Sequence, residues 1–150
     1  MKVREVMTRD PLCCIPEDTA QKVAMMLRDQ DIGSMPVVLD LSSRKLVGFI
    51  TDRDLCCKVV AKGLDSANTR IDRIFSLNAI SCREGENVNN CEELMQRHQV
   101  RRIPVTDVEG CVIGIVSQAD LALREVPEKV SRTVAEISRP ATNSRSSLAA

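Results

Sequence analysis

The stretch GFITDRDL, residues 48–55, recurs as GIVSQADL at residues 114–121, 66 positions later. Upstream of each copy lies a shorter match, MPV at 35–37 and IPV at 103–105, and these two are 68 positions apart. The second copy is therefore two residues shorter between its matched segments, where we expect a hairpin loop that tolerates a change in length. Two matched segments in the same order indicate a duplicated unit.

Each copy has the pattern of a β-α-β-β-α unit. Apolar stretches at 12–15 and 79–82 predict the first strands, and apolar residues at helical spacing predict the helices that follow. Two strands come next in each copy, after a proline that we place at the first strand's beginning, where it removes no ladder hydrogen bond. We expect these strands at 37–39, 45–50, 105–107 and 112–116, with a last helix beginning at Thr51 or Ser117.

The predicted fold class is α/β in the α+β sense, with two tandem β-α-β-β-α repeats packed sheet to sheet with pseudo-two-fold symmetry. One repeat of about 55 residues buries too little surface to be stable alone, and pairing two repeats removes that problem. We expect the first repeat at 1–62, a linker at 63–69 and the second repeat at 70–126. A helix with an apolar stripe and then a loose tail should occupy 127–150.

Composition narrows the class of protein. The 150 residues include 21 basic and 21 acidic side chains, and aromatic residues make up 1% of the chain. Nucleic-acid binders usually have a basic excess, and single-strand binders add stacking aromatic residues, so nucleic acid is not an expected partner. No apolar run reaches the roughly 20 residues of a membrane helix, and the first residues lack the apolar core of a secretion signal. We therefore expect a cytoplasmic protein without a membrane partner.

Seven cysteines are present, at 13, 14, 56, 57, 82, 91 and 111, and no Cys-x-x-Cys pair occurs. Adjacent cysteines are poor ligands for one tetrahedral metal ion, because neighbouring side chains on a strand point apart. The simplest interpretation treats them as small buried apolar residues in a reducing compartment, with no metal site. A thiol-based redox or metal sensor is the alternative.

The motifs Thr51-x-x-Asp54 and Ser117-x-x-Asp120 each follow a strand and admit two interpretations. In the first, the hydroxyl caps a helix and the aspartate completes a capping box. In the second, the hydroxyl and the free amide groups of a helix N-terminus bind a phosphate, while the carboxylate accepts hydrogen bonds from a ribose diol. Together with apolar strand walls for a flat base, the second interpretation describes a nucleoside phosphate.

The chain resembles a CBS-domain pair, and it is most similar to small stand-alone bacterial proteins of that family. The resemblance covers about residues 3–126 and rests on the two copies of 48–54 and 114–120, with 35–37 and 103–105 upstream. Such pairs usually form a disc-shaped homodimer and bind AMP, ADP, ATP or S-adenosylmethionine in clefts between the repeats. The resemblance implies that Asp54 and Asp120 hold ribose, that Thr51 and Ser117 face phosphate, and that backbone near Met35, Pro36, Ile103 and Pro104 borders adenine.

The two copies differ where Arg101 and Arg102 replace Gly33 and Ser34. Arginine suits phosphate because its guanidinium is a planar fork of donors, so we expect the cleft that these arginines border to prefer a more highly charged nucleotide. Alternatively, the two arginines lie on a solvated edge or form ion pairs in a dimer.

No catalytic motif was found: the chain has no phosphate-binding Gly-x-x-x-x-Gly-Lys-Ser/Thr loop and no Gly-x-Gly-x-x-Gly. The expected function is therefore that of a non-catalytic regulatory sensor without a cofactor, which binds an adenosine-containing molecule and acts on a separate effector protein. The alternatives are a dimeric structural adaptor that binds no nucleotide, and the thiol-based sensor.

Overall fold

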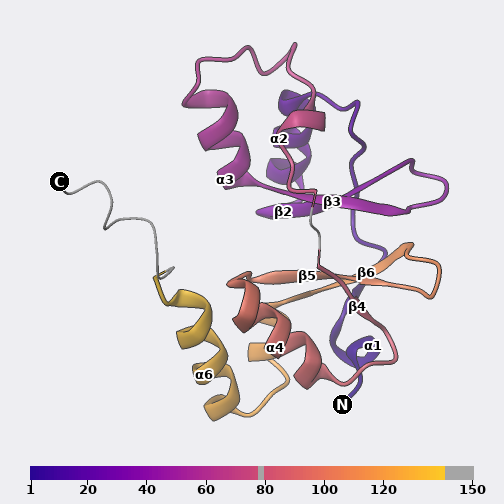
Figure 1. The fold of residues 1–150 in the computed structure, drawn as a ribbon, viewed down its shortest axis with the longest axis vertical. Coiled ribbons are helices and arrows are strands. Elements are labelled where there is room, and N and C mark those ends of the chain that lie inside the picture. Colours follow the sequence, from indigo (N-terminus) through magenta and orange to yellow (C-terminus); the bar gives the residue numbers. More distant parts are fainter. Residues whose placement is uncertain (78–79, 141–150) are drawn as a thin grey trace.

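The computed structural model describes residues 1–77 and 80–140. Two halves lie one above the other, each with its β-strands toward the middle of the molecule and helices on the outer side (Figure 1). The predicted α+β class, with two tandem repeats packed sheet to sheet, is confirmed.

Corresponding elements occupy the two repeats. The first repeat contains α2 (Ala20–Asp29), β2 (Ser34–Val38), β3 (Leu46–Thr51) and α3 (Asp52–Leu55), which continues as a π-helical turn, η1 (Cys56–Val60). The second contains β4 (Cys82–Arg83), α4 (Val88–His98), β5 (Arg102–Thr106), β6 (Val112–Ser117) and α5 (Gln118–Ala122). The remaining elements are α1 (Val3–Val6), β1 (Thr8–Arg9), the 3₁₀ turn η2 (Ile71–Arg73) and α6 (Pro127–Ser138).

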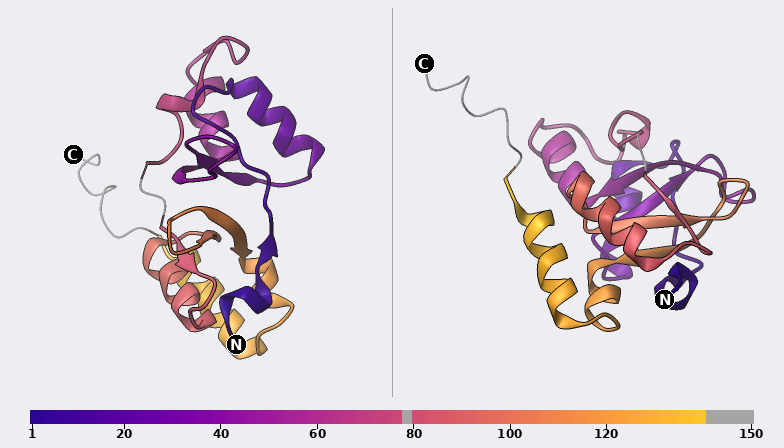
Figure 2. Two further views of the ribbon diagram at one scale, coloured as in Figure 1. Left: turned by 90° about the vertical axis from the view of Figure 1, so that its right-hand side faces the viewer. Right: turned by 60° about the horizontal axis from the view of Figure 1, so that its bottom comes forward.

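Each half is completed by the segment that precedes the other repeat. Strand β1 pairs antiparallel with β6, and the buried residues of α1 pack in the core of the second half. In return, Ser76 bridges to Phe49 of β3, and Phe75 packs in the core of the first half. The N-terminal segment can be followed from the lower half to the upper half in the left panel of Figure 2. This exchange interlocks the halves, and each core contains residues from both sides of the repeat boundary.

Two glycines make the exchange sterically possible. A Cβ atom at Gly48 would lie 2.3 Å from the Phe75 ring and 2.5 Å from the carbonyl oxygen of Ser76. At the corresponding Gly114, a Cβ atom would lie 2.6 Å from the sulfur of Met7. The glycine of each repeated motif therefore gives room to a side chain that arrives from the other repeat's leading segment.

Two details of the predicted strands are wrong. The stretch at 12–15 is not a strand, since Cys14 makes only an isolated parallel bridge to Val37, and only the last residue of the expected strand at 79–82 lies in β4, residue 79 being outside the described residues. Strands β2 and β5 begin two residues before their prolines. Pro36 is tolerated inside β2 because its backbone faces away from β3: its carbonyl accepts from Cys14 N at 3.1 Å.

The hairpin loops of the two repeats meet near the pseudo-two-fold axis. Lys45 and Cys111, which occupy equivalent positions, form an antiparallel bridge. Beside it, the Arg44 guanidinium donates to the carbonyl oxygens of Pro11 at 2.7 Å and Val112 at 3.1 Å. A small apolar cluster that includes Val38 and Val112 joins the two halves at the same place.

The expected C-terminal helix is present as α6, which packs beside α4 with Thr133 and Ile137 buried. The tail expected after it lies, from residue 141 onward, outside the described residues. Among the helices that the structure describes, none is both long and apolar enough to cross a membrane.

Candidate functional site

Both Ser/Thr-x-x-Asp motifs form capping boxes at the strand-to-helix junctions. Thr51 Oγ1 accepts from Asp54 N at 3.1 Å, and Thr51 N donates to Asp54 Oδ2 at 3.0 Å. In the second repeat the same two bonds, between Ser117 and Asp120, are 3.2 Å and 2.7 Å long. Each hydroxyl also donates to its aspartate, at 3.2 Å from Thr51 and 2.6 Å from Ser117. The capping interpretation is therefore realised in both repeats, and each hydroxyl would have to rotate before it could donate to a ligand.

The two aspartates differ at their second carboxylate oxygen. Asp54 Oδ1 lies 2.9 Å from the ammonium group of Lys58, one turn further along the chain. Arg124 occupies the equivalent position in the second repeat, but its guanidinium donates to the backbone carbonyl of Glu5 instead. Within residues 1–77 and 80–140, no donor is found for Asp120 Oδ1. The second motif therefore keeps a carboxylate oxygen for another partner.

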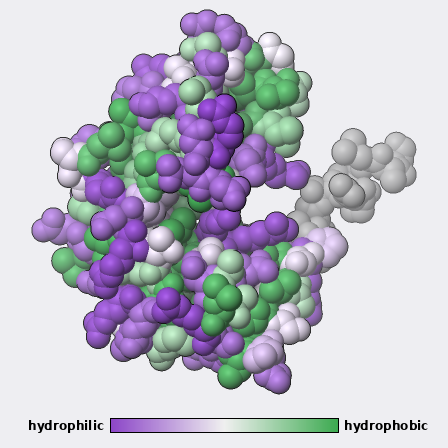
Figure 3. All heavy atoms as spheres, turned by 180° about the vertical axis from the view of Figure 1, so that it is seen from behind, coloured by the Kyte–Doolittle hydropathy of each residue, from purple (hydrophilic) through white to green (hydrophobic). Residues whose placement is uncertain are grey.

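Ser117 and Asp120 lie in a cleft of about 360 Å³ between the two halves. Seen from behind, the surface of the molecule is hollowed where the halves meet, and hydrophilic residues are frequent at the opening (Figure 3). The cleft's lining comes from three places: the N-terminal segment around β1, the α2–β2 side of the first half, and β5, β6 and α5 of the second. These lining residues are Thr8, Arg9, Asp10, Pro11, Leu12, Gln30, Ile32, Ser34, Pro36, Arg102, Ile115, Ser117 and Asp120.

Polar and apolar groups face each other across this cleft. Arg9 and Arg102 provide positive charge, and Asp10 and Asp120 provide negative charge. The Arg102 side chain is half-buried and crosses from β5 to the first half, where Nη1 donates to Ser34 Oγ at 3.1 Å. Apolar side chains from all three parts of the lining provide surfaces against which a flat ring could pack. The cleft can therefore accept hydrogen bonds from hydroxyl groups, donate to an anion and cover an apolar ring.

Four of the predicted site residues meet in this cleft: Pro36, Arg102, Ser117 and Asp120. The others lie elsewhere. The side chains of Met35 and Ile103 are fully buried in the cores of their own halves, Pro104 is buried as well, and the Arg101 side chain is exposed.

Thr51 and Asp54 lie at the position related to Ser117 and Asp120 by the pseudo-two-fold axis. The cleft described above does not include them. Residues 78 and 79 correspond in the repeat to Asp10 and Pro11, and they lie outside the described residues.

Sequence reasoning missed the contribution of the N-terminal segment, residues 8–12. No local pattern distinguishes this segment from an ordinary connection. The one signal was the repeat itself, because an offset of 68 aligns Thr8 with Ser76 just before the second unit. Only the observed crossing between halves brings the segment to the motif of the other repeat.

The CBS-domain family model matches this chain twice, over residues 3–60 and 71–125. The chain belongs to the CBS-domain family. Two curated proteins are similar to it along most of their length. YlbB of Bacillus subtilis is 33% identical over 138 residues, covering 91% of each chain, and Hypoxic response protein 1 of Mycobacterium tuberculosis is 32% identical over 125 residues, covering 83% of this chain and 85% of the relative.

Solved CBS-domain structures have the same fold. Hypoxic Response Protein I with two coordinated zinc ions gives a TM-score of 0.75 at 31% identity, covering 85% of this chain and 100% of that one. The CBS domain pair of protein MJ0100, in complex with 5′-methylthioadenosine and S-adenosyl-L-methionine, gives 0.72 at 27% identity, covering 82% and 94%. These matches support a regulatory ligand-binding module of the CBS type.

The cysteines of this CBS chain are dispersed. Cys13, Cys14, Cys82 and Cys91 are buried, whereas Cys56 and Cys57 are exposed on η1. In the part of the chain that the structure describes, no group of three or more His, Cys, Asp or Glu side chains is arranged to hold a metal ion.

Proposed function

We propose that this CBS pair is a non-catalytic regulatory module that binds an adenosine-containing ligand, an adenine nucleotide or S-adenosylmethionine, in the cleft at Ser117 and Asp120. The observation that carries the proposal is the position of Asp120 Oδ1, an oxygen without a donor among the described residues, in a cleft that also contains Arg102. A carboxylate accepts from both hydroxyls of a ribose, and charge-assisted hydrogen bonds of this kind are the stronger class.

The remaining groups of the cleft match the rest of such a ligand. The Arg102 guanidinium offers donors to a phosphate, or to the carboxylate of S-adenosylmethionine. Ile32, Pro36 and Ile115 provide apolar surface for the base. The volume of about 360 Å³ falls within the range of roughly 300–1,000 Å³ that is usual for small-molecule sites.

We infer that the second-repeat motif is the stronger of the two sites. A ligand at the Thr51–Asp54 motif would have to share Asp54 with Lys58, whose ammonium group lies 2.9 Å from Oδ1. A ligand at Asp120 meets no such competitor among the residues described. The complex of the MJ0100 pair with S-adenosylmethionine supports the ligand class, since that pair covers most of this chain's length.

Regulation follows from the position of the cleft between the two halves. A ligand that contacts Pro36 in the first half and Asp120 in the second favours one relative placement of the halves over others. We propose that this shift is transmitted through a homodimer to a separate effector protein in the cytoplasm.

The test is a thermal-shift screen of the purified chain against AMP, ADP, ATP, S-adenosylmethionine and adenosine. At a concentration of about 100 times the dissociation constant, one ligand should stabilise the protein by about 2.7 kcal/mol, which raises the melting temperature by roughly 5–10 °C. Chromatography of the ligand after incubation should recover it unchanged. A folded protein that shows no shift with any of the five compounds would contradict the proposal and favour the adaptor interpretation.

A further inference from the structure

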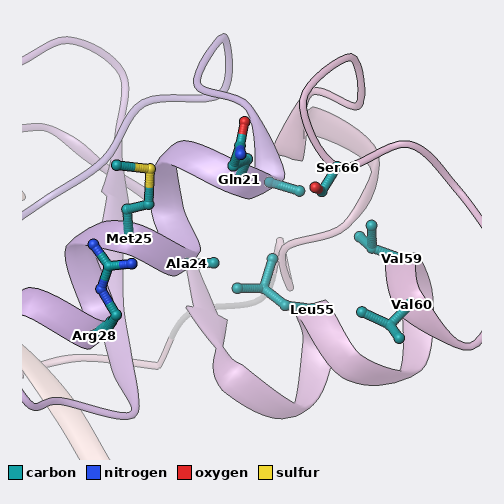
Figure 4. Close-up of a pocket in the computed structure, with 9 residues that line it drawn as sticks. Gln21, Ala24, Met25, Arg28, Leu55, Val59, Val60 and Ser66 are labelled. Carbon is teal, nitrogen blue, oxygen red and sulfur yellow. The ribbon is translucent and has the colours of Figure 1, made fainter.

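The outer helix faces of the two halves are equivalent by the repeat, but only one of them is covered. In the first half, an open groove between α2 and the α3–η1 helix is lined by Ala24, Met25, Leu55 and Val60 (Figure 4). The equivalent face of the second half lies under α6, which runs beside α4 (Figure 1 and the right panel of Figure 2). Helix α6 follows the matched CBS segments, which end at residue 125.

Polar contacts form much of the seam between α6 and the second half. Lys129 Nζ lies 2.6 Å from Asn89 Oδ1, 3.4 Å from Glu125 Oε2 and 4.0 Å from Glu92 Oε2. Gln96 Nε2 donates to Thr133 Oγ1 at 2.9 Å. Helix α6 is thus attached by contacts that water can replace, together with the apolar contact of Ile137 with the core.

Glu92 of α4 lies beneath this seam, and its carboxylate is incompletely hydrogen-bonded. The residue is 4% exposed, and its Oε1 atom is buried without a hydrogen-bond partner in the described structure. The charged groups that face it are Lys129 and Arg132 from α6 and Glu125 from the segment before α6, with Glu93 beside it on α4. Burial raises the pKa of Glu92 above its usual value; Lys129 opposes this shift, and Glu125 adds to it.

The repeat shows that the helix face itself does not require this carboxylate. Ala24 occupies the equivalent position in α2, on the open face. The buried acid is therefore a feature of the covered face alone. An ionised carboxylate is costly in such a place, because Oε1 has no hydrogen-bond partner and the ammonium group of Lys129 lies 4.0 Å from Oε2; the carboxylate regains water only if the cover moves away.

We propose that α6 is a releasable cover over the helix face of the second half, and that it detaches as Glu92 ionises. Glu92 holds its proton more tightly when α6 is docked than when α6 is detached. The docked state is therefore strongest below the usual pKa of a glutamate, and it weakens as pH rises through the raised pKa. Each unit by which docking raises that pKa changes the docking equilibrium tenfold.

Hydrogen–deuterium exchange of the full chain tests this inference without reference to any ligand. Protection factors of the α6 amides, corrected for the intrinsic pH dependence of exchange, are measured from roughly pH 4 to pH 8, the range in which a raised glutamate titrates. Amides of β5 in the same sample report global unfolding. Protection of α6 should fall as pH rises while protection of β5 stays constant.

Two substitutions and two controls locate the effect. Glu92→Gln should keep α6 protected across the whole range, and Glu92→Ala, which copies Ala24, should also remove the pH dependence. Glu93→Gln changes the neighbouring exposed acid, and His98→Gln removes the only histidine; both should leave the wild-type profile unchanged. Protection that increases with pH and is lost in Glu92→Gln would show that a Glu92–Lys129 ion pair holds α6, and would overturn the proposal. A wild-type profile without pH dependence would also overturn it.

Discussion

Arg102 Nη1 donates to the Oγ atom of Ser34 at 3.1 Å, and these two residues occupy the same position in the two repeats, 68 residues apart. A residue and its own counterpart therefore meet at the pseudo-two-fold axis. Ser34 is 5% exposed, so the contact joins the halves at the floor of the cleft. Because the two positions have diverged, the Asp120 cleft is lined by an arginine where the other repeat has a serine, and the proposed ligand would lie beside its guanidinium.

This position predicts how the two adjacent arginines differ. Arg102→Ala should weaken binding of AMP about ten- to a hundredfold, the usual effect of removing a charged hydrogen bond, and should leave adenosine nearly unaffected. Arg101→Ala is the matched control, because that side chain is exposed outside the cleft lining. Calorimetric titration with AMP and with adenosine gives the ratio of the dissociation constants of each variant and the wild type. Equal losses for AMP and adenosine, or equal effects of the two substitutions, would contradict the assignment of Arg102 to the phosphate.

The glycines of the repeated motif should differ in their tolerance of a methyl group. At Gly48 a Cβ atom would meet a backbone oxygen at 2.5 Å, whereas at Gly114 the nearest atom, at 2.6 Å, belongs to the flexible Met7 side chain. Gly48→Ala should therefore destabilise the fold by about 1–3 kcal/mol, the usual range for overpacking, and Gly114→Ala by less. Urea unfolding monitored by circular dichroism gives both values. A larger destabilisation by Gly114→Ala than by Gly48→Ala would show that the two crossing segments do not pack against these glycines as described.

Thiol labelling should separate the cysteines into two groups. Cys56 and Cys57 are exposed and should react with a disulfide reagent within the native state. Cys14 should not, because burial raises the pKa of its thiol to about 12 and the thiolate is the reacting species. Mass spectrometry after brief labelling identifies the sites. Rapid native labelling of Cys14, or of the equally buried Cys82 or Cys91, would favour the thiol-sensor alternative.

The raised thiol pKa also predicts the stability at alkaline pH. A thiol whose pKa is higher in the folded state contributes stability that is complete below its unfolded pKa of 9.0 and decreases as pH rises toward the folded value. Between pH 9.0 and about pH 12, Cys14 should lower the free energy of unfolding by about 1.4 kcal/mol per pH unit. Denaturant titrations of wild type and Cys14→Ala measure the difference in slope. Parallel slopes would show that Cys14 ionises as readily folded as unfolded.

The sequence predicted the repeat, the class of fold and the positions of β3 and β6, because those depend on local patterns. Local chemistry also explains where two helices begin, although the sequence analysis did not use it: Thr19 and Asn87 start α2 and α4 at equivalent positions, each accepting a backbone N–H. The failures involve partners distant in the chain. β1 has only two residues and no periodicity of its own, and it exists because β6 offers an edge.

The site was predictable only in part for the same reason. The motif identified Ser117 and Asp120, but whether an aspartate keeps a free oxygen depends on where Lys58 and Arg124 direct their side chains. Both are basic residues at equivalent positions, and both donate to a backbone carbonyl, Lys58 to Ile74 at 2.8 Å and Arg124 to Glu5. They differ because Lys58 also pairs with its aspartate, a side-chain placement that the repeated pattern does not specify.

The role of Asp120 is decided by calorimetric titration of the ligand found in the screen into wild type, Asp120→Ala and Asp54→Ala. Each substitution removes the capping box of its own repeat, so the two should lower the stability by similar amounts. Circular dichroism checks that both variants are folded. We expect a loss of about ten- to a hundredfold in affinity for Asp120→Ala and a much smaller loss for Asp54→Ala. Unchanged affinity in Asp120→Ala, with the protein folded, would contradict this role.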